Sequence, residues 1–155
     1  MSSVPGIPPI LSAIQSDLCE SGIDGVLSTH IQRDALEKFS YVSPIGAAGV
    51  YLHAVAGDFQ KEGAARELFK SMIREISTLA AAMGYPFEKD YVKINLEILS
   101  NLSADATTSM QRDIMEGKPS ELDGLVMEPL RLAKKYSVSM PCYEEVANAL
   151  CPLEF

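Results

Sequence analysis

The chain has 155 residues, of which 47% are hydrophobic and 22% are charged, as expected for one globular domain. A net charge of −8, with no basic run longer than Lys134-Lys135, argues against a nucleic-acid surface. No apolar stretch reaches the roughly 20 residues that span a bilayer, and the N-terminus lacks the basic segment of a secretory signal.

Helical periodicity dominates the first half of the chain. Apolar residues recur at helical spacing over residues 10–21, and Gly22 is a plausible C-terminal cap. A longer helix is predicted over residues 31–56. It contains Pro44, which should kink or break it, and the small-residue run 46–49, which permits close helix contacts.

The second half continues the same pattern. Residues 61–83 show the clearest amphipathic helix, with Gly84 as its stop signal. Further helices are predicted over residues 91–102, from a cap at Asp105 or Thr107 to Gly117, from Ser120 to about residue 136, and over residues 143–150. Strand signals are nearly absent, so residues 1–155 are predicted to form a single all-α domain.

Three polar side chains are candidates for ligand chemistry: Lys38, Ser109 and Glu121. A lysine among apolar neighbours can stabilise or protonate an oxyanion, although an ion pair with Asp34 on a solvated helix face is the more ordinary role. Ser109 can bind a ligand or a nearby backbone group. Glu121 is equally well explained by its favourable position at a helix N-terminus. Taken singly, each residue favours the structural explanation.

Other chemistry has little support in the sequence. Cys19, Cys142 and Cys151 lack metal-ligand spacing, so we expect reduced thiols, a cytoplasmic location and no metal site. His30 and His53 show no partner spacing for a metal or a catalytic triad. The chain contains no glycine-rich dinucleotide loop and no nucleophile elbow.

Several motifs together resemble one enzyme family. Residues 109–113 (SMQRD) and 116–123 (EGKPSELD) are similar to the signature of ketopantoate reductases (2-dehydropantoate 2-reductases), and residues 136–141 (YSVSMP) resemble the end of the helix that follows it. Residues 31–39 (IQRDALEKF) resemble the start of the helix that presents the catalytic lysine. These matches occur in the family's order. They correspond to the C-terminal half of the family's architecture, without its N-terminal Rossmann domain.

The resemblance implies roles for the three candidate residues. Lys38 matches the catalytic lysine, Ser109 a substrate-contacting serine, and Glu121 an acidic residue beside the substrate and the nicotinamide ribose. NADPH would supply the hydride and would be bound mainly by the Rossmann domain. The family's asparagines one and two turns after the lysine are replaced by Val42 and Gly46, and Ala35 replaces a tryptophan-like landmark. These departures leave the exact substrate open: ketopantoate is the family default, and a different 2-oxo acid or a loss of activity are the alternatives.

Two hypotheses follow for function. In the first, the chain is the substrate-binding and catalytic-lysine domain of an NADPH-dependent 2-oxo acid reductase in pantothenate biosynthesis, inactive when isolated. In the second, it is a non-catalytic helical interaction or dimerisation module left from such a reductase. The small-residue run 46–49 and the missing cofactor domain motivate this second hypothesis and a possible homodimer.

Overall fold

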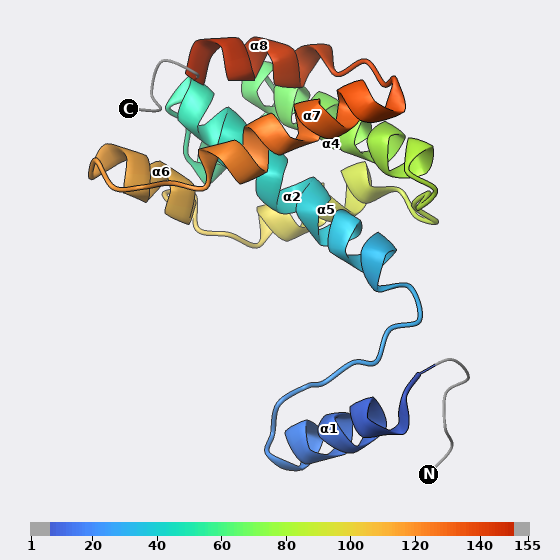
Figure 1. Cartoon of the computed structure of the whole chain (residues 1–155). Helices are drawn as coiled ribbons and strands as arrows, with labels where there is room; N and C mark the ends of the chain where they lie inside the picture. The colour runs from blue at the N-terminus through green and yellow to red at the C-terminus, as the bar shows by residue number, and fades with distance from the viewer. Residues whose placement is uncertain (1–6, 151–155) are drawn as a thin grey trace.

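The computed structural model describes residues 7–150, which form helices joined by turns and loops (Figure 1). The elements are α1 (Pro9–Glu20), α2 (Ile31–Leu52), α3 (Ala56–Gln60), α4 (Ala64–Ala82), α5 (Tyr91–Ser100), α6 (Ser109–Met115), the π-helical segment η1 (Asp123–Met127), α7 (Glu128–Tyr136) and α8 (Pro141–Leu150). No strand occurs within residues 7–150, which confirms the predicted all-α class.

Helix α2 is the centre of the helical body. It packs against α4, α5, α6, α8 and η1, and residues 43–50 are buried. The small-residue run 46–49 lies inside this buried stretch, because small side chains let the surrounding helices approach closely. The run therefore packs against other helices of the same chain and offers no exposed surface to a second copy.

Pro44 lies inside α2 without ending it. Proline has no N–H, so the carbonyl of Ser40, four residues earlier, loses its usual helical partner. The buried side chain of Asn95 on α5 supplies a replacement: its Nδ2 donates to the Ser40 carbonyl at 3.1 Å and to Ser40 Oγ at 3.0 Å. A tertiary hydrogen bond thus satisfies the helix where its own backbone cannot.

The hydrophobic core follows from the periodicity of α4. One face of this helix is fully buried, through Phe69, Met72, Ile73, Ile76 and Leu79. Burial of each such side chain stabilises the fold by about 1.5–3 kcal/mol. The prediction for residues 61–83 is confirmed in type, and the helix runs from Ala64 to Ala82.

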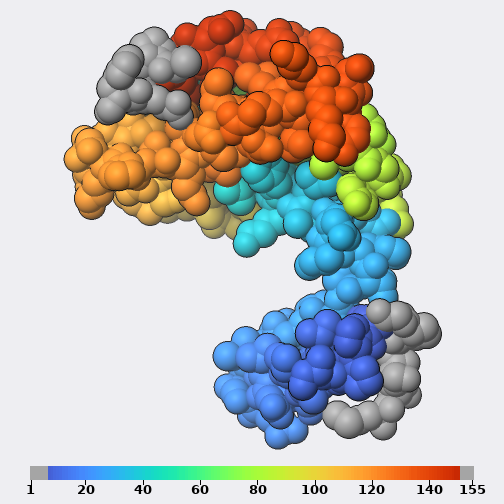
Figure 2. Space-filling model, in the orientation of Figure 1, coloured from blue at the N-terminus to red at the C-terminus, as the bar shows by residue number. Residues whose placement is uncertain are grey.

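Helix α1 stands apart from this body (Figures 1 and 2). It contains no buried residue, and its apolar residues are exposed at Ile10, Leu11, Ile14 and Leu18. The space-filling view shows a wide hollow between α1 and the underside of the body. Within the described part of the chain, no helix is long and apolar enough to cross a bilayer.

Three predicted boundaries are wrong. Helix α2 ends at Leu52 rather than at residue 56, because His53 adopts a left-handed conformation with φ of 51°, and the short α3 follows. Helix α6 is capped by Thr108, not by Asp105 or Thr107, and ends at Met115. The last long helix begins with the π-helical segment η1, and the regular helix α7 starts only at Glu128.

Candidate functional site

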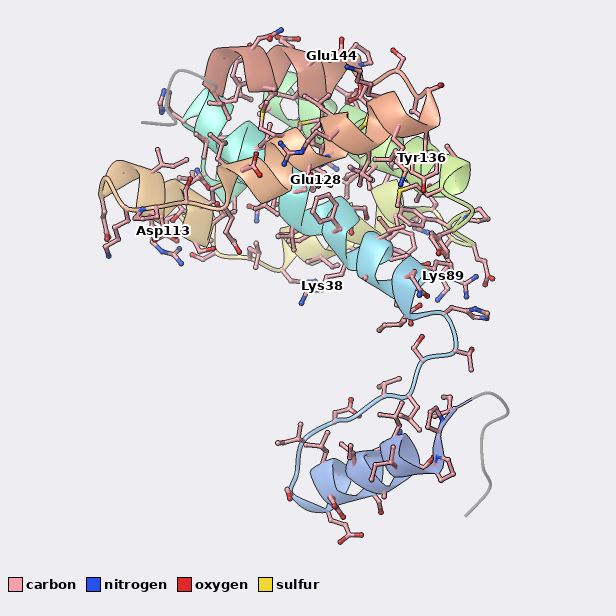
Figure 3. The ribbon with its side chains drawn as sticks, viewed as in Figure 1. Lys38, Lys89, Asp113, Glu128, Tyr136 and Glu144 are labelled. Atoms are coloured by element: carbon pink, nitrogen blue, oxygen red, sulfur yellow. The ribbon has the colours of Figure 1, made fainter. Side chains whose placement is uncertain are left out.

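Lys38 lies on α2 and is exposed, as expected for a lysine on a solvated helix face. Figure 3 shows its side chain projecting away from the helical body, on the side that faces α1. The expected ion pair with Asp34 does not form: the Asp34 carboxylate accepts a hydrogen bond from Ser28 Oγ instead. No salt bridge among residues 7–150 involves Lys38, so its ammonium group is available to a ligand.

Ser109 is the first residue of α6 and is exposed. The helix start is fixed by a capping box, in which Thr108 Oγ1 accepts the N–H of Gln111 at 3.3 Å and Gln111 Oε1 accepts the N–H of Thr108 at 2.9 Å. Gln111 Nε2 also donates to the Ala54 carbonyl at 2.8 Å. The backbone beside Ser109 is therefore held firmly while its hydroxyl remains accessible.

Glu121 is exposed and lies immediately before the helical residues that lead into η1. Its backbone carbonyl accepts the N–H of Leu125 at 2.9 Å, so the residue stands at the start of the helical segment. The expected capping box between Ser120 and Asp123 does not form among the described residues. The Asp123 carboxylate instead binds Arg131 through two hydrogen bonds of 2.9 and 2.7 Å, which hold the pKa of Asp123 below its usual value.

The elements that carry these three residues meet at Gly46. A Cβ placed there would lie 3.9 Å from Thr108 Oγ1 and 3.9 Å from Leu125 Cδ1. Gly46 follows Lys38 by two helical turns, or about 12 Å along the axis at 1.5 Å per residue. The structure thus packs the lysine-bearing helix against the start of α6 and against the segment that follows Glu121. Convergence of the three side chains remains a prediction.

Sequence reasoning missed two cavities beside this junction. One, of about 240 Å³, lies between α2, α3, α5 and the start of α6, and the other, of about 490 Å³, lies between the C-terminal end of α2 and α6. Gln111 lines both cavities. Their walls come from segments far apart in the sequence, so no local motif indicates them. Among the described residues, no cluster of histidine, cysteine and acidic side chains could hold a metal ion.

The described residues thus form an all-α domain on whose surface Lys38, Ser109 and Glu121 are exposed. Residues 30–154 match the family model described as ketopantoate reductase PanE/ApbA C terminal. The chain belongs to this family, as the sequence motifs predicted.

Relatives with longer chains share this domain. The chain is 24% identical over 136 residues to a 2-dehydropantoate 2-reductase from Nostoc sp., covering 88% of this chain and 42% of that protein. The structure resembles that of 2-dehydropantoate 2-reductase from Methylococcus capsulatus, with a TM-score of 0.85, 23% identity and coverage of 96% of this chain and 47% of the other. It also resembles D-mandelate dehydrogenase with NADH and anilino(oxo)acetate, with a TM-score of 0.82, 18% identity and coverage of 97% and 63%. The chain spans about two fifths of the length of the curated relatives it matches.

Proposed function

We propose that this chain forms the substrate-binding and catalytic-lysine part of an NADPH-dependent 2-oxo acid reductase, with ketopantoate as the family's default substrate. The observation that carries the proposal is the unpaired, exposed Lys38 on a helix that packs against both other site elements at Gly46. Family membership and the similarity to 2-dehydropantoate 2-reductases support the same reaction class.

The chemistry assigned to each residue follows from its charge and position. As a keto carbon is reduced, negative charge develops on its oxygen, and the Lys38 ammonium group stabilises that charge and donates a proton to it. The Ser109 hydroxyl and the Glu121 carboxylate hold the ligand's polar groups and fix its orientation. The resulting product is a 2-hydroxy acid.

The hydride must come from a reduced nicotinamide cofactor. Nothing in this sequence matches the glycine-rich loop that binds a dinucleotide pyrophosphate, so this chain does not fit NADPH by the usual route. We assign cofactor binding to the Rossmann domain that the family resemblance implies. Three features support a neighbouring domain on this side of the molecule: the exposed apolar residues of α1, the hollow between α1 and the body (Figure 2), and the position of Lys38 on the side that faces α1 (Figure 3). The free thiols of Cys19 and Cys142 agree with a cytoplasmic location.

A reductase assay tests this proposal. We expect NADPH-dependent reduction of a 2-oxo acid when the chain is joined to the family's nucleotide-binding domain, and no reduction by the 155-residue chain alone. A panel of 2-oxo acids that includes ketopantoate identifies the substrate. A folded two-domain protein that reduces none of them would overturn the proposal.

A non-catalytic interaction module is the second candidate. It is favoured by the exposed apolar residues of α1, a helix that packs against no other helix among the described residues. A relative is described as a dimeric ketopantoate reductase from Staphylococcus aureus, which supports testing for a homodimer. Light scattering over a concentration series distinguishes the cases, because a strict monomer at every concentration removes the dimer hypothesis.

A further inference from the structure

A pair of buried hydroxyl groups lies where α2, α8 and η1 meet. These three elements pack against one another in every pairing. Ser43 Oγ on α2 is 2.5 Å from the hydroxyl oxygen of Tyr143 on α8, and both side chains are fully buried. Ser43 Oγ also donates to the Leu125 carbonyl of η1 at 2.6 Å. One serine hydroxyl therefore joins all three elements.

The backbone of Leu125 connects this pair to Glu121. The Leu125 N–H donates to the Glu121 carbonyl at 2.9 Å, while the Leu125 carbonyl accepts the Ser43 hydroxyl. Ser43 lies on the buried side of α2, five residues or about 7.5 Å along the helix axis after the exposed Lys38. Two hydrogen bonds in series thus link the helix that carries Lys38 to the backbone of Glu121.

Pro129 explains why the Leu125 carbonyl depends on Ser43. Pro129 follows Leu125 by four residues and has no N–H, so this carbonyl lacks the donor that an α-helix would supply. The same arrangement occurs at Pro44, where the side chain of Asn95 binds the freed carbonyl. If the Ser43 hydroxyl is removed, no α-helical donor replaces it, and the segment must shift to expose the Leu125 carbonyl to water.

Tyr143 fixes the direction of the serine hydroxyl. Burial raises the pKa of Tyr143, so its phenol stays protonated and donates to Ser43 Oγ. The serine therefore receives one hydrogen bond and gives its own to Leu125. The backbone N–H of Tyr143 donates in turn to the Glu75 carboxylate at 3.1 Å, which holds the hydroxyl pair to the core helix α4.

We propose that Ser43 and Tyr143 are positioning residues for the reduction, which hold the Glu121 segment at a fixed height along the helix of Lys38. The inference rests on the proposed function, in which Lys38 and Glu121 contact the same ligand. Neither hydroxyl contacts that ligand, since both side chains are fully buried. Their effect passes through Glu121, because a displacement of about 1 Å in a ligand-orienting group lowers turnover by up to about 100-fold.

The first test compares two fully buried serines of α2 in the two-domain protein. Ser43→Ala removes the bond to Leu125, whereas Ser40→Ala removes hydrogen bonds to Glu37 and Asn95 and leaves the bond to η1 in place. We expect Ser43→Ala to lower kcat/KM about 10- to 100-fold, and Ser40→Ala, the matched control, to leave it unchanged. Equal losses in the two variants would indicate general destabilisation and overturn the inference.

A double-mutant cycle separates positioning from a purely structural role. In the Glu121→Ala background the group that Ser43 positions is missing, so Ser43→Ala should lower kcat/KM further by no more than about twofold. Effects that multiply in full would place the action of Ser43 elsewhere and overturn the inference. Tyr143→Phe keeps the ring and the serine, so we expect a smaller loss that is likewise absent from the Glu121→Ala background. This variant carries the same test if Ser43→Ala does not fold.

Amide hydrogen exchange of the 155-residue chain tests the link without catalysis. Ser43→Ala should speed exchange of the Leu125 N–H at least about fivefold relative to that of Ile76, in the core of α4. Ser40→Ala should leave this ratio unchanged. A faster Leu125 N–H, with no reduction of any 2-oxo acid by the two-domain protein, would overturn the proposed function and retain the link. An unchanged ratio in Ser43→Ala would overturn the inference even with an active reductase.

Discussion

The side chain of Asn95 donates a hydrogen bond to the Ser40 carbonyl, which has no helical partner because Pro44 lacks an N–H. Because the Ser40 carbonyl is buried, its loss of a donor would carry the full cost of an unsatisfied polar group, about 1–3 kcal/mol. We expect Asn95→Leu to lower the free energy of unfolding by about 2–3 kcal/mol, measured by urea denaturation.

A double-mutant cycle tests the stated cause. Pro44→Ala restores a backbone N–H in α2 that can serve the Ser40 carbonyl. In that background, Asn95→Leu should cost about 1 kcal/mol less than in the natural sequence. Additive effects of the two changes would show that Asn95 stabilises the fold for a reason unrelated to the proline.

Gly49 allows α6 to approach α2 at the position of Gln111. A Cβ at residue 49 would lie 2.7 Å from both Cδ and Oε1 of Gln111, and hydrogen bonds to Ala54 and Thr108 hold that side chain in place. We expect Gly49→Ala to destabilise the fold by about 1–3 kcal/mol, as overpacking does. Gly124→Ala is the control because a Cβ there meets no atom within 4 Å. A control that loses as much stability as Gly49→Ala would contradict the packing argument.

Two tyrosine hydroxyls in the body have opposite hydrogen-bonding states. The Ser43 hydroxyl donates to the Leu125 carbonyl at 2.6 Å, so the fully buried Tyr143 hydroxyl, 2.5 Å from Ser43 Oγ, is the donor of that pair. The Tyr41 hydroxyl is buried and has no partner among the described residues, and burial raises its pKa. We expect Tyr143→Phe to cost about 1–2 kcal/mol and Tyr41→Phe to be neutral or stabilising. Thermal unfolding of both variants measures the contrast, and equal losses would argue against it.

The sequence predicts those parts of the fold that depend on local pattern. The apolar spacing of α4 is sufficient to predict this helix, because a helix with one buried face repeats apolar residues every three or four positions. The five-residue α3 is too short to show a period, and the end of α2 depends on the left-handed conformation of His53. Among several possible caps before α6, Thr108 is selected by a tertiary contact, since Gln111 completes the capping box and also binds Ala54.

The same distinction applies to the candidate site. Lys38, Ser109 and Glu121 stand in motifs that resemble those of the family, so the sequence alone is enough to name them as candidates. The cavity beside them is formed by small apolar residues such as Ala56 and Ala106, which no motif singles out. Their proximity comes from a backbone hydrogen bond between segments about 50 residues apart, which only the folded chain contains.

Cys142 should react slowly with thiol reagents although its side chain is only partly buried. Burial, with a smaller contribution from the nearby Glu75 carboxylate, raises the pKa of this thiol to about 11. At pH 8 only about 0.1% of it would be thiolate, the reactive form. Peptide mapping after brief iodoacetamide treatment should show modified Cys19, which is exposed, before modified Cys142. Equal rates at the two cysteines would contradict the expected protection.

Lys38 provides the most direct test of catalysis, because its exposed side chain makes no described ion pair whose loss would destabilise the fold. In the two-domain protein, Lys38→Ala should lower kcat by at least about 100-fold, the usual effect of removing a general acid, with an unchanged melting temperature. Lys134→Ala, at another exposed lysine, should change neither quantity. Lys38→Arg separates the two roles assigned to the ammonium group, since arginine keeps the charge but gives up a proton far less readily. Substantial recovery by arginine would show that charge stabilisation suffices, and full activity in Lys38→Ala would remove the residue from the mechanism.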